Sequence, residues 1–503
     1  MLKARKPVLI ALFALLLLLA GAGTQWAQVD ELGAIHFDLP YDLSGAVFLA
    51  TPEAAEILAS LPPALPPQLV EGADQPLSST STSGPLFTTL VSNDSNQDVE
   101  AAIMSITLGS GVTRTTSAFI KYVTIGGQLR TRNYFRTTTD FSTWAGGELP
   151  IPTGYLRSAD PLMDANIHTT GIAAKRMYTV GITLQQQPFQ LPNAIALWRS
   201  DNGGATWTTP TMVTVNSTQS NYHLDKPDVA VSWYSNTLGH VYVAYVKASA
   251  NININPHELY VARSTNGGLS FDAPILVTTG RIQGPQIMVD PATGRVYLVW
   301  VDYNLNAIRM SSATSAATSW TTPVSGATGN MVPPVTYLGG NVLGATIPMA
   351  RWNGVANSLS IVWHQYEAGV SGATDIYYTA YSPSSGWIPK RLVNFYTERD
   401  QFMPSIDYDY SGELMIMFYD RYRDLLNSYY EESWAKIDPY GTLLAYGQLG
   451  TWSNPDKYGN KFVGDYQDIW FWSFLDSWGD RFNGVWTYQP HSGSGNINVT
   501  GIR

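Results

Sequence analysis

Five segments of this chain share one pattern, in which an alternating apolar strand enters a short polar turn that closes on a Trp or Phe. The closing residues are separated by 63, 64, 49 and 67 positions, and they are Trp144, Trp207, Phe271, Trp320 and Trp387. This period is too long for the rung of a solenoid and suits a four-stranded blade of a β-propeller. The repeat therefore predicts an all-β propeller.

The turn at residues 200–207 (SDNGGATW) shows the physical logic of the repeat. Its Asp and Asn side chains can accept backbone N–H groups, its glycines supply positive φ, and Trp207 is expected to return into the core between neighbouring sheets. Residues 264–271 (STNGGLSF) repeat the turn with Thr265 in place of Asp201. Residues 97–503 thus resemble the Asp-box proteins, whose repeat is Ser-x-Asp-x-Gly-x-x-Trp and whose best-known members are sialidases. The resemblance implies a six-bladed propeller.

Direct counting gives seven blades. Seven apolar segments, 57 to 69 residues apart, fit inner strands and centre near Ile103, Ile172, Val229, Ile287, Met349, Ile406 and Ile469. The last unit has room for only three strands before the chain ends. We therefore predict that residues 86–91 supply its fourth strand and close the ring, which removes an exposed sheet edge.

Composition and charge restrict the partners. The chain has 503 residues, 12% aromatic and only 14% charged, and its net charge of -10 argues against nucleic acid and anionic lipid as partners. Cysteine is absent, so disulfides and thiolate metal sites are impossible. Asp407 and Asp409, and the pair Asp465 and Asp468, are weak candidates for Ca²⁺ ligands, but no EF-hand-like loop is present and strand alternation explains Asp407 and Asp409 equally well, so no cofactor is predicted.

The N-terminus predicts export. Lys3, Arg5 and Lys6 precede an apolar run over residues 8–20 and a small-residue site ending at Ala22, so residues 1–22 are predicted to be a cleaved signal peptide. We expect a secreted monomer without a stable membrane anchor. Residues 23–86 form an N-terminal extension with a short helix starting near Thr51 and a Pro/Ser-rich linker, interpreted as a pro-segment or a strap. Residues 87–503 are assigned to the propeller.

Strand order predicts where a site lies. In a blade the inner strand leaves the substrate face and the third strand leaves it again, so the aromatic turns lie on the opposite side. Functional residues are expected at the starts of inner strands and the ends of second strands. The substrate-binding candidates there are His223, Lys226, Gln286, Asp302, Tyr303, His364, Arg399, Asp400, Asp420 and Asp465.

The catalytic candidates follow from the arginines and from the resemblance. Arg421 and Arg423 are spaced i, i+2, so their guanidinium groups can point the same way and bind a carboxylate, unless the flanking aspartates neutralise them. The resemblance to sialidases implies three arginines, a Tyr nucleophile activated by a Glu, and an Asp acid/base. The candidates are Tyr466, Glu398 or Glu367 as its base, and Asp225.

This assignment departs from the family pattern at one point. The Arg-Ile-Pro signature is missing, and the first unit offers only Arg130, Arg132 and Arg136 near its outer strands.

The expected function is that of a sialidase-like, exo-acting glycosidase on extracellular glycans. Two alternatives remain open. A binding or adhesion propeller would use aromatic platforms such as those in residues 470–478, whose other explanation is blade packing. A polysaccharide lyase would use a His or Tyr base beside an arginine, with His223, His364, Tyr303 and Arg421 as candidates.

Overall fold

The computed structural model describes residues 27–29, 35–37, 59, 85–93, 95–167, 175–185, 192–219, 221–249, 251, 255–339, 341–366, 373–450, 452–458, 461–472, 479–490 and 496–503. Seven antiparallel sheets in these residues form a seven-bladed β-propeller, which confirms the direct count and not the six blades that the resemblance implied. The signal peptide falls outside the described residues, as does the helix expected near Thr51 except for Ala59. In the described part of the chain, no helix has the length and apolar character needed to span a membrane.

Blades 1 to 4 follow the chain, each from its inner to its outer strand. Blade 1 contains β4 (Asp98–Thr107), β5 (Thr113–Ile125), β6 (Gln128–Thr138) and β7 (Ala145–Glu148). Blade 2 contains β8 (Arg157–Asn166), β9 (Arg176–Leu184), β10 (Asn193–Ser200) and β11 (Thr211–Asn216). Blade 3 contains β12 (Tyr222–Val231), β13 (Val241–Ser249), β14 (His257–Ser264) and β15 (Ile275–Gly280), with the 3-10 helix η1 (Ser235–Thr237) after β12. Blade 4 contains β16 (Ile282–Val289), β17 (Val296–Asp302), β18 (Ala307–Ala313) and β19 (Val324–Thr328).

Blades 5 to 7 complete the ring. Blade 5 contains β20 (Asn330–Met331), β23 (Met349–Asn353), β24 (Ser358–Tyr366), β25 (Thr374–Ser382), β26 (Gly386–Trp387) and β27 (Arg391–Leu392). Blade 6 contains β28 (Gln401–Tyr408), β29 (Leu414–Asp420), β30 (Glu431–Ile437) and β31 (Leu443–Gln448). Blade 7 contains β32 (Asp468–Trp472), β33 (Arg481–Tyr488), β34 (Asn496–Ile502) and β3 (Pro85–Leu90).

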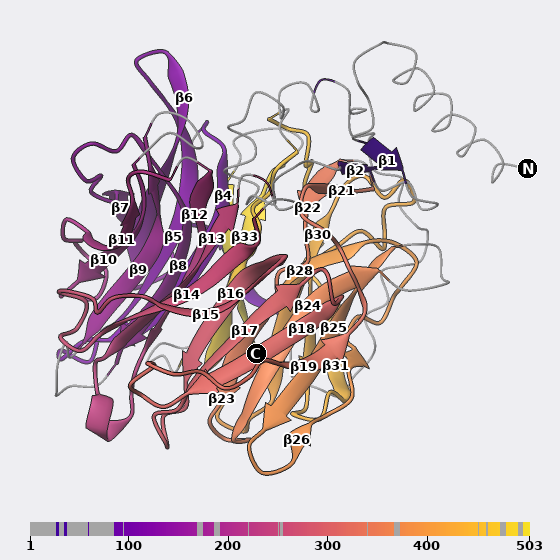
Figure 1. Ribbon diagram of the computed structural model, residues 1–503. Helices are drawn as coiled ribbons and strands as arrows, with labels where there is room; N and C mark the ends of the chain where they lie inside the picture. The colour runs from indigo at the N-terminus through magenta and orange to yellow at the C-terminus, as the bar shows by residue number, and fades with distance from the viewer. Residues whose placement is uncertain are drawn as a thin grey trace, which may run out of the picture.

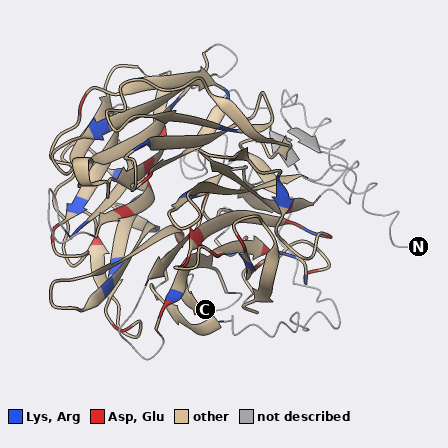
Figure 2. Ribbon diagram, turned by 90° about the horizontal axis from the view of Figure 1, so that it is seen from below, with Lys and Arg blue, Asp and Glu red and all other residues tan. Residues whose placement is uncertain are grey.

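Ring closure by an early strand is confirmed. The strand β3 pairs antiparallel with β34, and the Thr88 and Thr500 hydroxyls across this ladder lie 3.0 Å apart. In Figure 1 the yellow strand β33 of blade 7 lies beside the indigo strand β4 of blade 1, so the two ends of the propeller meet. The blue and red ribbon segments that mark Lys, Arg, Asp and Glu are sparse in the view from below (Figure 2), in keeping with a charged fraction of 14%.

The inner strand of blade 5 is interrupted. Both β20 and β23 pair antiparallel with β24, and residues 332–348 leave the sheet between them. This insertion carries the hairpin of β21 (Thr336–Leu338) and β22 (Val342–Gly344), on which β1 (Ala27–Val29) and β2 (Ile35–Phe37) pack as further strands. Figure 1 shows the four strands side by side at one end of the molecule. The N-terminal extension is therefore attached to the propeller by strand pairing.

All five aromatic turns connect the third and fourth strands of their blades. In the best copy the Ser200 hydroxyl oxygen accepts from the Gly204 N–H at 2.8 Å, and Asn202 Oδ1 accepts from the Thr206 N–H at 2.9 Å. The acceptor inside the turn is thus Asn202, whereas Asp201 pairs with Arg176. Trp207 packs edge-on against Phe135 of blade 1, with ring centroids 6.0 Å apart, which confirms its place between neighbouring sheets.

Six of the seven expected inner strands are confirmed, and one assignment is wrong. The inner strand of blade 2 is β8 at residues 157–166, while Ile172 lies beyond its end and outside the described residues. The misassignment arose because β8 contains Asp160-Pro161 and Asp164, which interrupt the apolar pattern expected of a buried strand.

Asp160 and Pro161 form a β-bulge, and similar bulges occur in other inner strands of the ring. Register shifts occur in β4, β8, β12, β16 and β28, and the bulged residue has a positive φ in every case. Proline follows the bulged residue in four of these strands, at Pro161, Pro227, Pro285 and Pro404. Proline lacks an N–H and is tolerated where the ladder is already broken. The bulges aim side chains from different blades at one another near the propeller axis.

Candidate functional site

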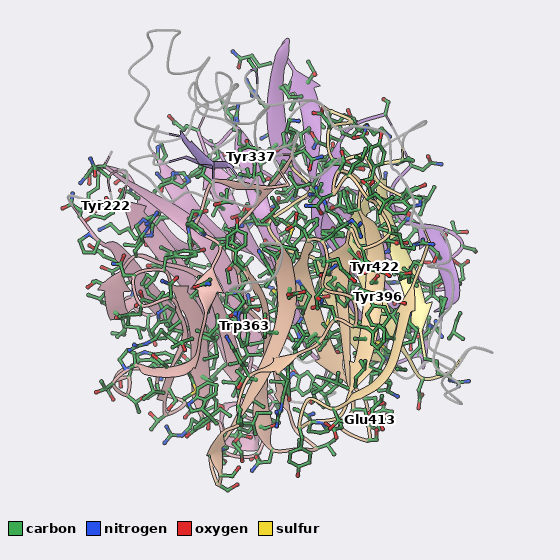
Figure 3. The ribbon with its side chains drawn as sticks, turned by 90° about the vertical axis from the view of Figure 1, so that its right-hand side faces the viewer. Tyr222, Tyr337, Trp363, Tyr396, Glu413 and Tyr422 are labelled. Carbon is green, nitrogen blue, oxygen red and sulfur yellow. The ribbon has the colours of Figure 1, made fainter. Side chains whose placement is uncertain are left out.

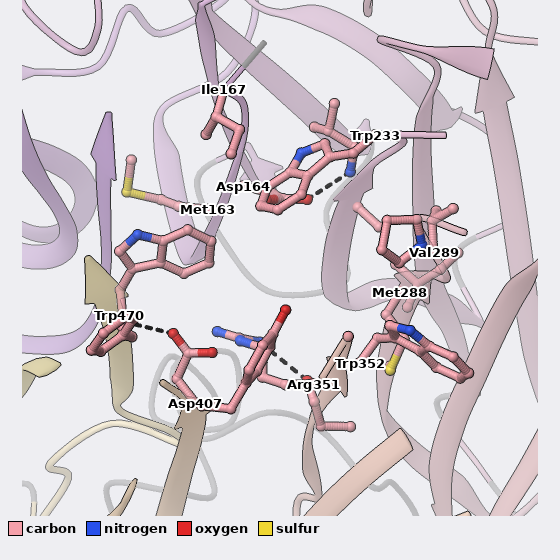
Figure 4. Close-up of a pocket in the computed structure, with 18 of the residues that line it drawn as sticks. Met163, Asp164, Ile167, Trp233, Met288, Val289, Arg351, Trp352, Asp407 and Trp470 are labelled. Atoms are coloured by element: carbon pink, nitrogen blue, oxygen red, sulfur yellow. Dashed lines mark hydrogen bonds between the residues drawn. The ribbon is translucent and has the colours of Figure 1, made fainter. Parts of the chain in front are cut away.

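The two faces of the propeller are distinguished by strand direction. The entry face holds the starts of the inner strands, and the turn face holds their ends together with the aromatic turns. A cavity of about 430 Å³ opens on the turn face, between the ends of β8, β12, β16, β23, β28 and β32. Six blades contribute to this axial pocket, so it lies where their inner strands converge (Figure 4). From strand order, functional residues were expected on the opposite face and only structural turns on this one.

Aspartates on four inner strands each bind the next blade at or beside this pocket. Asp164 Oδ2 accepts from the Val231 N–H at 2.6 Å, Asp228 Oδ2 from the Ile287 N–H at 2.7 Å, and Asp407 Oδ2 from the Phe471 N–H at 2.6 Å. Asp468 continues the series by accepting from the Ile103 N–H at 3.1 Å. Each carboxyl therefore satisfies a backbone donor of the following inner strand, and three of them line the pocket.

The charges of the pocket are unbalanced. The guanidinium of Arg351 donates to Asp468 Oδ1 at 2.7 Å. Burial raises the pKa of Asp164, Asp228 and Asp407 to about 7, although the backbone donors and Arg351 act in the opposite direction. Burial would lower the pKa of Arg351, but the surrounding aspartates more than offset this and raise it. The pocket thus holds a permanently charged arginine beside carboxyls that are part-protonated near neutral pH.

Aromatic side chains form much of the remaining wall. Trp233 lies beside Asp164, Trp470 lies across the pocket beside Asp407, and Trp352 stands near Arg351 (Figure 4). Tyr410, 68% exposed, stands at the rim with its ring edge-on to Phe471 at 5.0 Å. The pocket therefore combines broad apolar faces with a few convergent polar groups, as small-molecule sites do.

A second cluster, the buried charge centre, lies at the bulges on the entry side. The Lys226 ammonium is 2.6 Å from Asp465 Oδ2, 3.4 Å from Asp160 Oδ2 and 3.8 Å from Glu100 Oε1. The carboxylate oxygens of Glu100, Asp160 and Asp465 lie within 4.8 Å of one another, a spacing at which carboxylates can hold a metal ion. Here the ammonium of Lys226 lies among them and supplies the positive charge.

Burial governs the protonation of this centre. It raises the pKa of Asp160 to about 6 and that of Glu100 well above its usual range, with Lys226 acting against both shifts. Burial would lower the pKa of Lys226, but Asp160, Asp465 and Glu100 raise it above its usual value. Lys226 is therefore a permanently charged part of the core.

Several predicted site residues meet at or beside this centre. Lys226 and Asp465 belong to it, the Lys226 ammonium lies 4.9 Å from the centroid of the Tyr466 ring, and Asp225 Oδ2 accepts from Gln283 Nε2 at 2.9 Å. Burial, then Glu100 and Asp160, raise the pKa of Tyr466 well above its usual range. Such a phenol is not activated as a nucleophile by its surroundings. The carboxylate beside it is that of Glu100, a residue the sequence did not single out.

The arginine pair does not form a common fork. Arg421 is fully buried and donates to Leu338 O at 3.1 Å and Asn341 Oδ1 at 2.6 Å, so it anchors the blade 5 insertion. Arg423 instead forms an ion pair with Glu431. The flanking Asp420 accepts from Gln401, Ser433 and Tyr446, all at 2.9 Å. Protein acceptors thus engage both guanidinium groups, but the carboxylates paired with them are Asp400 and Glu431 and not the flanking aspartate Asp420.

Glu398 and Arg399 lie in the loop before β28. Glu398 is exposed and accepts from the Thr397 N–H, while Arg399 donates to Tyr422 O at 2.7 Å. The rings of Tyr396 and Tyr422 stack beside them at 3.6 Å (Figure 3). Asp400, 3.4 Å from Arg421, is buried. The structure therefore gives Glu398 neighbours other than Tyr466, and its role as the base of Tyr466 stays a prediction without a contact to support it.

The remaining candidates have structural partners. Burial lowers the pKa of His223 and His364 to about 3, and His364 Nδ1 accepts from the Met403 N–H at 3.3 Å. Tyr303 donates to Thr346 O at 2.9 Å, and Asp302 caps the turn that follows it. Gln286 is buried and its amide donates to Pro285 O at 3.3 Å. These side chains stabilise the entry side of their blades.

The residues of the axial pocket were largely missed. Of its charged groups the sequence reasoning considered only Asp407 and Asp409, as weak metal ligands. A usable signal was present, because Asp164 and Asp407 each stand three residues after an inner-strand proline, at Pro161 and Pro404, and Arg351 stands three residues after Pro348, which directly precedes β23. Pro161 and Pro404 mark bulges, and the third residue after each lines the pocket.

Comparison with known proteins gives distant structural matches. No protein-family model and no curated protein sequence matches this chain. The α-L-arabinofuranosidase of Fusarium graminearum is 10% identical, with a TM-score of 0.44 over 82% of this chain and 98% of that one. A leech intramolecular trans-sialidase is 10% identical, with a TM-score of 0.43 over 74% and 70%. A polysaccharide lyase of family PL25, an ulvan lyase, is 9% identical, with a TM-score of 0.47 over 82% and 95%.

Proposed function

We propose that this protein binds extracellular glycan in the axial pocket. The observation that carries the proposal is the combination of Trp and Tyr faces with inward carboxyls in a cavity of about 430 Å³. A volume of this order suits a ligand of one to a few sugar rings, since ligand pockets span about 300–1,000 Å³. Aromatic faces pack against the apolar faces of sugar rings, and carboxylates accept hydrogen bonds from sugar hydroxyls.

The charge of the pocket argues against sialic or uronic acid as the ligand. Such a carboxylate would meet Asp164, Asp228 and Asp407, while Arg351 is already engaged by Asp468. Arg421 and Arg423, the residues expected to hold a substrate carboxylate, have protein partners. We therefore propose a glycan ligand that is neither a sialic acid nor a uronic acid.

Hydrolysis is the second candidate function, and one observation favours it. Asp228 and Asp407 have pKa values raised to about 7 by burial, so a protonated carboxyl is available at neutral pH. General acid catalysis of glycoside cleavage needs such a group together with a second carboxylate. Release of reducing sugar without a rise in ultraviolet absorbance supports hydrolysis, whereas release accompanied by the absorbance of an unsaturated uronide supports the lyase alternative.

The binding test compares two exposed tyrosines. Tyr410, 68% exposed, lines the pocket, and Tyr440, 73% exposed, lies in the turn between β30 and β31. A glycan array identifies ligands of the wild-type protein, and titration then measures affinity. Tyr410→Ala is expected to weaken binding by roughly 2- to 10-fold, the value of one aromatic contact, while Tyr440→Ala leaves it unchanged. Equal affinities of the two variants, or no glycan bound at all, would contradict the proposal.

Secretion as a monomer is part of the same proposal and rests on residues 1–22. Expression of the full chain should place a product beginning at Gly23 outside the cytoplasm, as read by fractionation and N-terminal sequencing. A chain lacking residues 2–22 should stay inside. Gel filtration of the exported product tests the monomer.

A further inference from the structure

We infer that the axial pocket selects a sugar unit carrying a protonated amine, so that a glucosamine-type glycan is preferred over its neutral counterpart. The inference deepens the proposed function and rests on it. It follows from the charges of the pocket wall, from the way these charges are paired, and from the aromatic rings beside them.

Three carboxyls of the wall share a single cation, Arg351, with Asp468. Asp164, Asp228 and Asp407 come from blades 2, 3 and 6, and each accepts a hydrogen bond from a neutral backbone N–H group. The guanidinium of the wall, Arg351, forms its ion pair with Asp468 at 2.7 Å. An ionised buried carboxylate is costly without a matching charge. An ammonium group in the pocket would supply that charge.

The fourth aspartate of the wall is already compensated. Asp409 accepts from the Ser411 and Glu413 N–H groups at 2.9 and 3.0 Å, and Lys436 lies 3.4 Å from it. Lys436 also pairs with Glu413 at 2.7 Å. The charge deficit is therefore confined to Asp164, Asp228 and Asp407 at the centre of the pocket.

The aromatic residues act in the same direction. Trp233 lies beside Asp164 and Trp470 beside Asp407 (Figure 4), and the negative face of an indole attracts a cation. A neutral sugar gains the apolar contact with these rings, whereas an amino sugar gains the cation–π attraction and the carboxyl partners as well.

The pocket should also release protons when the amine binds. The groups facing Asp164, Asp228 and Asp407 are Arg351 on β23 and Asp468 on β32, with Asp409, Glu413 and Lys436 beyond them. Because burial raises the pKa of the three carboxyls to about 7, they are part-protonated near neutrality. A bound ammonium stabilises the ionised form, so protons leave on binding.

The test uses three β-1,4-linked hexamers that differ only at C2, namely those of glucosamine, N-acetylglucosamine and glucose. Isothermal titration at pH 5.5, where the free amine is already protonated, and 0.15 M salt is expected to show at least about tenfold tighter binding of the glucosamine hexamer, a difference within reach of one paired charge. Titrations in two buffers of different ionisation enthalpy should reveal proton release with this hexamer alone.

Variants separate the pocket from the acidic surface. Asp407→Asn and Asp228→Asn keep an oxygen that can accept the backbone N–H, and they should reduce the preference to about twofold or less. Asp438→Asn, in the exposed turn before β31, is the matched control and should keep the preference. Thermal unfolding verifies that all three variants are folded.

The outcomes distinguish the inference from the function beneath it. Equal or tighter binding of the glucose or N-acetylglucosamine hexamer overturns the amine preference and leaves glycan binding standing. If Asp438→Asn reduces the preference as much as Asp407→Asn does, the hexamer binds as a polycation to the acidic surface. This result also overturns the amine preference of the pocket. If only unrelated glycans on the array bind, the inference fails alone, and if no glycan binds, both fail.

Discussion

Replacing Lys226 by Met should destabilise the propeller more than the loss of any surface ion pair. Lys226 is 4% exposed, and its ammonium lies 2.6, 3.4 and 3.8 Å from carboxylates of blades 7, 2 and 1. Methionine has a similar length and an apolar end, so the substitution removes the charge with little change in volume. Three buried carboxyls would then face one another without a cation.

The expected cost is about 3–5 kcal/mol at pH 8, the usual result of removing one partner of a buried ion pair. In a domain of this size each kcal/mol lowers the unfolding midpoint by roughly 2 °C, so the midpoint should fall by about 6–10 °C. Lys247→Met is the matched control, because its ion pair with Glu258 is similar in length at 3.1 Å but is 17% and 19% exposed. Its cost should be about 1 kcal/mol or less.

The loss of stability in Lys226→Met should also depend on pH, and the pKa values of the surrounding carboxyls determine the direction of that dependence. Burial raises the pKa of Asp160 to about 6 even with Lys226 present. A carboxyl whose folded pKa exceeds its unfolded value makes stability fall as pH rises from the unfolded to the folded pKa. Without Lys226 the folded pKa values rise further, so the decline continues to higher pH. Lys226→Met should therefore cost more at pH 8 than at pH 5.

Thermal unfolding followed by tryptophan fluorescence at pH 5, 6.5 and 8 measures both quantities. A Lys226→Met midpoint within 2 °C of that of Lys247→Met would refute the buried-charge argument. A loss that is the same at pH 5 and pH 8 would show that the carboxyls around Lys226 do not titrate as inferred.

Three further predictions concern the turns, the ring closure and the pocket. Gly204→Ala places a Cβ at a residue with φ +90°, against the Thr116 hydroxyl, and should lower the free energy of unfolding by at least about 1–2 kcal/mol, as measured by chemical denaturation. Gly147→Ala is the control, because nothing lies within 4 Å of the added Cβ, and should change that free energy by less than about 0.5 kcal/mol. A chain starting at residue 91 loses β3 and should unfold at a much lower temperature than one starting at residue 85; equal midpoints would mean that blade 7 does not need its borrowed strand. Asp228→Asn removes a carboxyl whose folded pKa is raised to about 7 and keeps an oxygen that can accept the Ile287 N–H. It should therefore raise the unfolding midpoint at pH 8 and leave the midpoint nearly unchanged at pH 4. A lower midpoint at pH 8 would contradict the sign of this effect.

The blade architecture was predictable because its determinants are local. In the turn at residues 200–207 the stabilising hydrogen bonds run from Ser200 to Gly204 and from Asn202 to Thr206, all within one short segment. The second strands, with β-branched and aromatic residues between turn signals, follow the same local rule. Counting the units then gave seven blades, and the missing strand of the last unit identified β3 as its partner.

The candidate site was predictable only in part, because bulges alter which side chains reach the axis. One extra residue in an inner strand reverses the in and out alternation beyond it, so the sequence pattern does not say which side chain faces the centre. Ile172 fits the apolar pattern expected of an inner strand better than β8 does, because Asp160, Pro161 and Asp164 interrupt that pattern, and Asp164 was therefore overlooked. Lys226 and Asp465 were singled out as substrate ligands, and the structure places them in a buried ion cluster.

The sequence alone determined the hairpins, the number of blades and the strand that closes them, since each of these depends on residues close together in the chain or on a count of repeats. Only the tertiary structure decided that Glu100, Asp160 and Asp465 surround the ammonium of Lys226. It also decided that Asp164, Asp228, Arg351 and Asp407 meet in a pocket on the turn face. These groups come from different blades, far apart in the sequence, and nothing local brings them together. Their meeting depends on closure of the ring, which places the inner strands around a common axis.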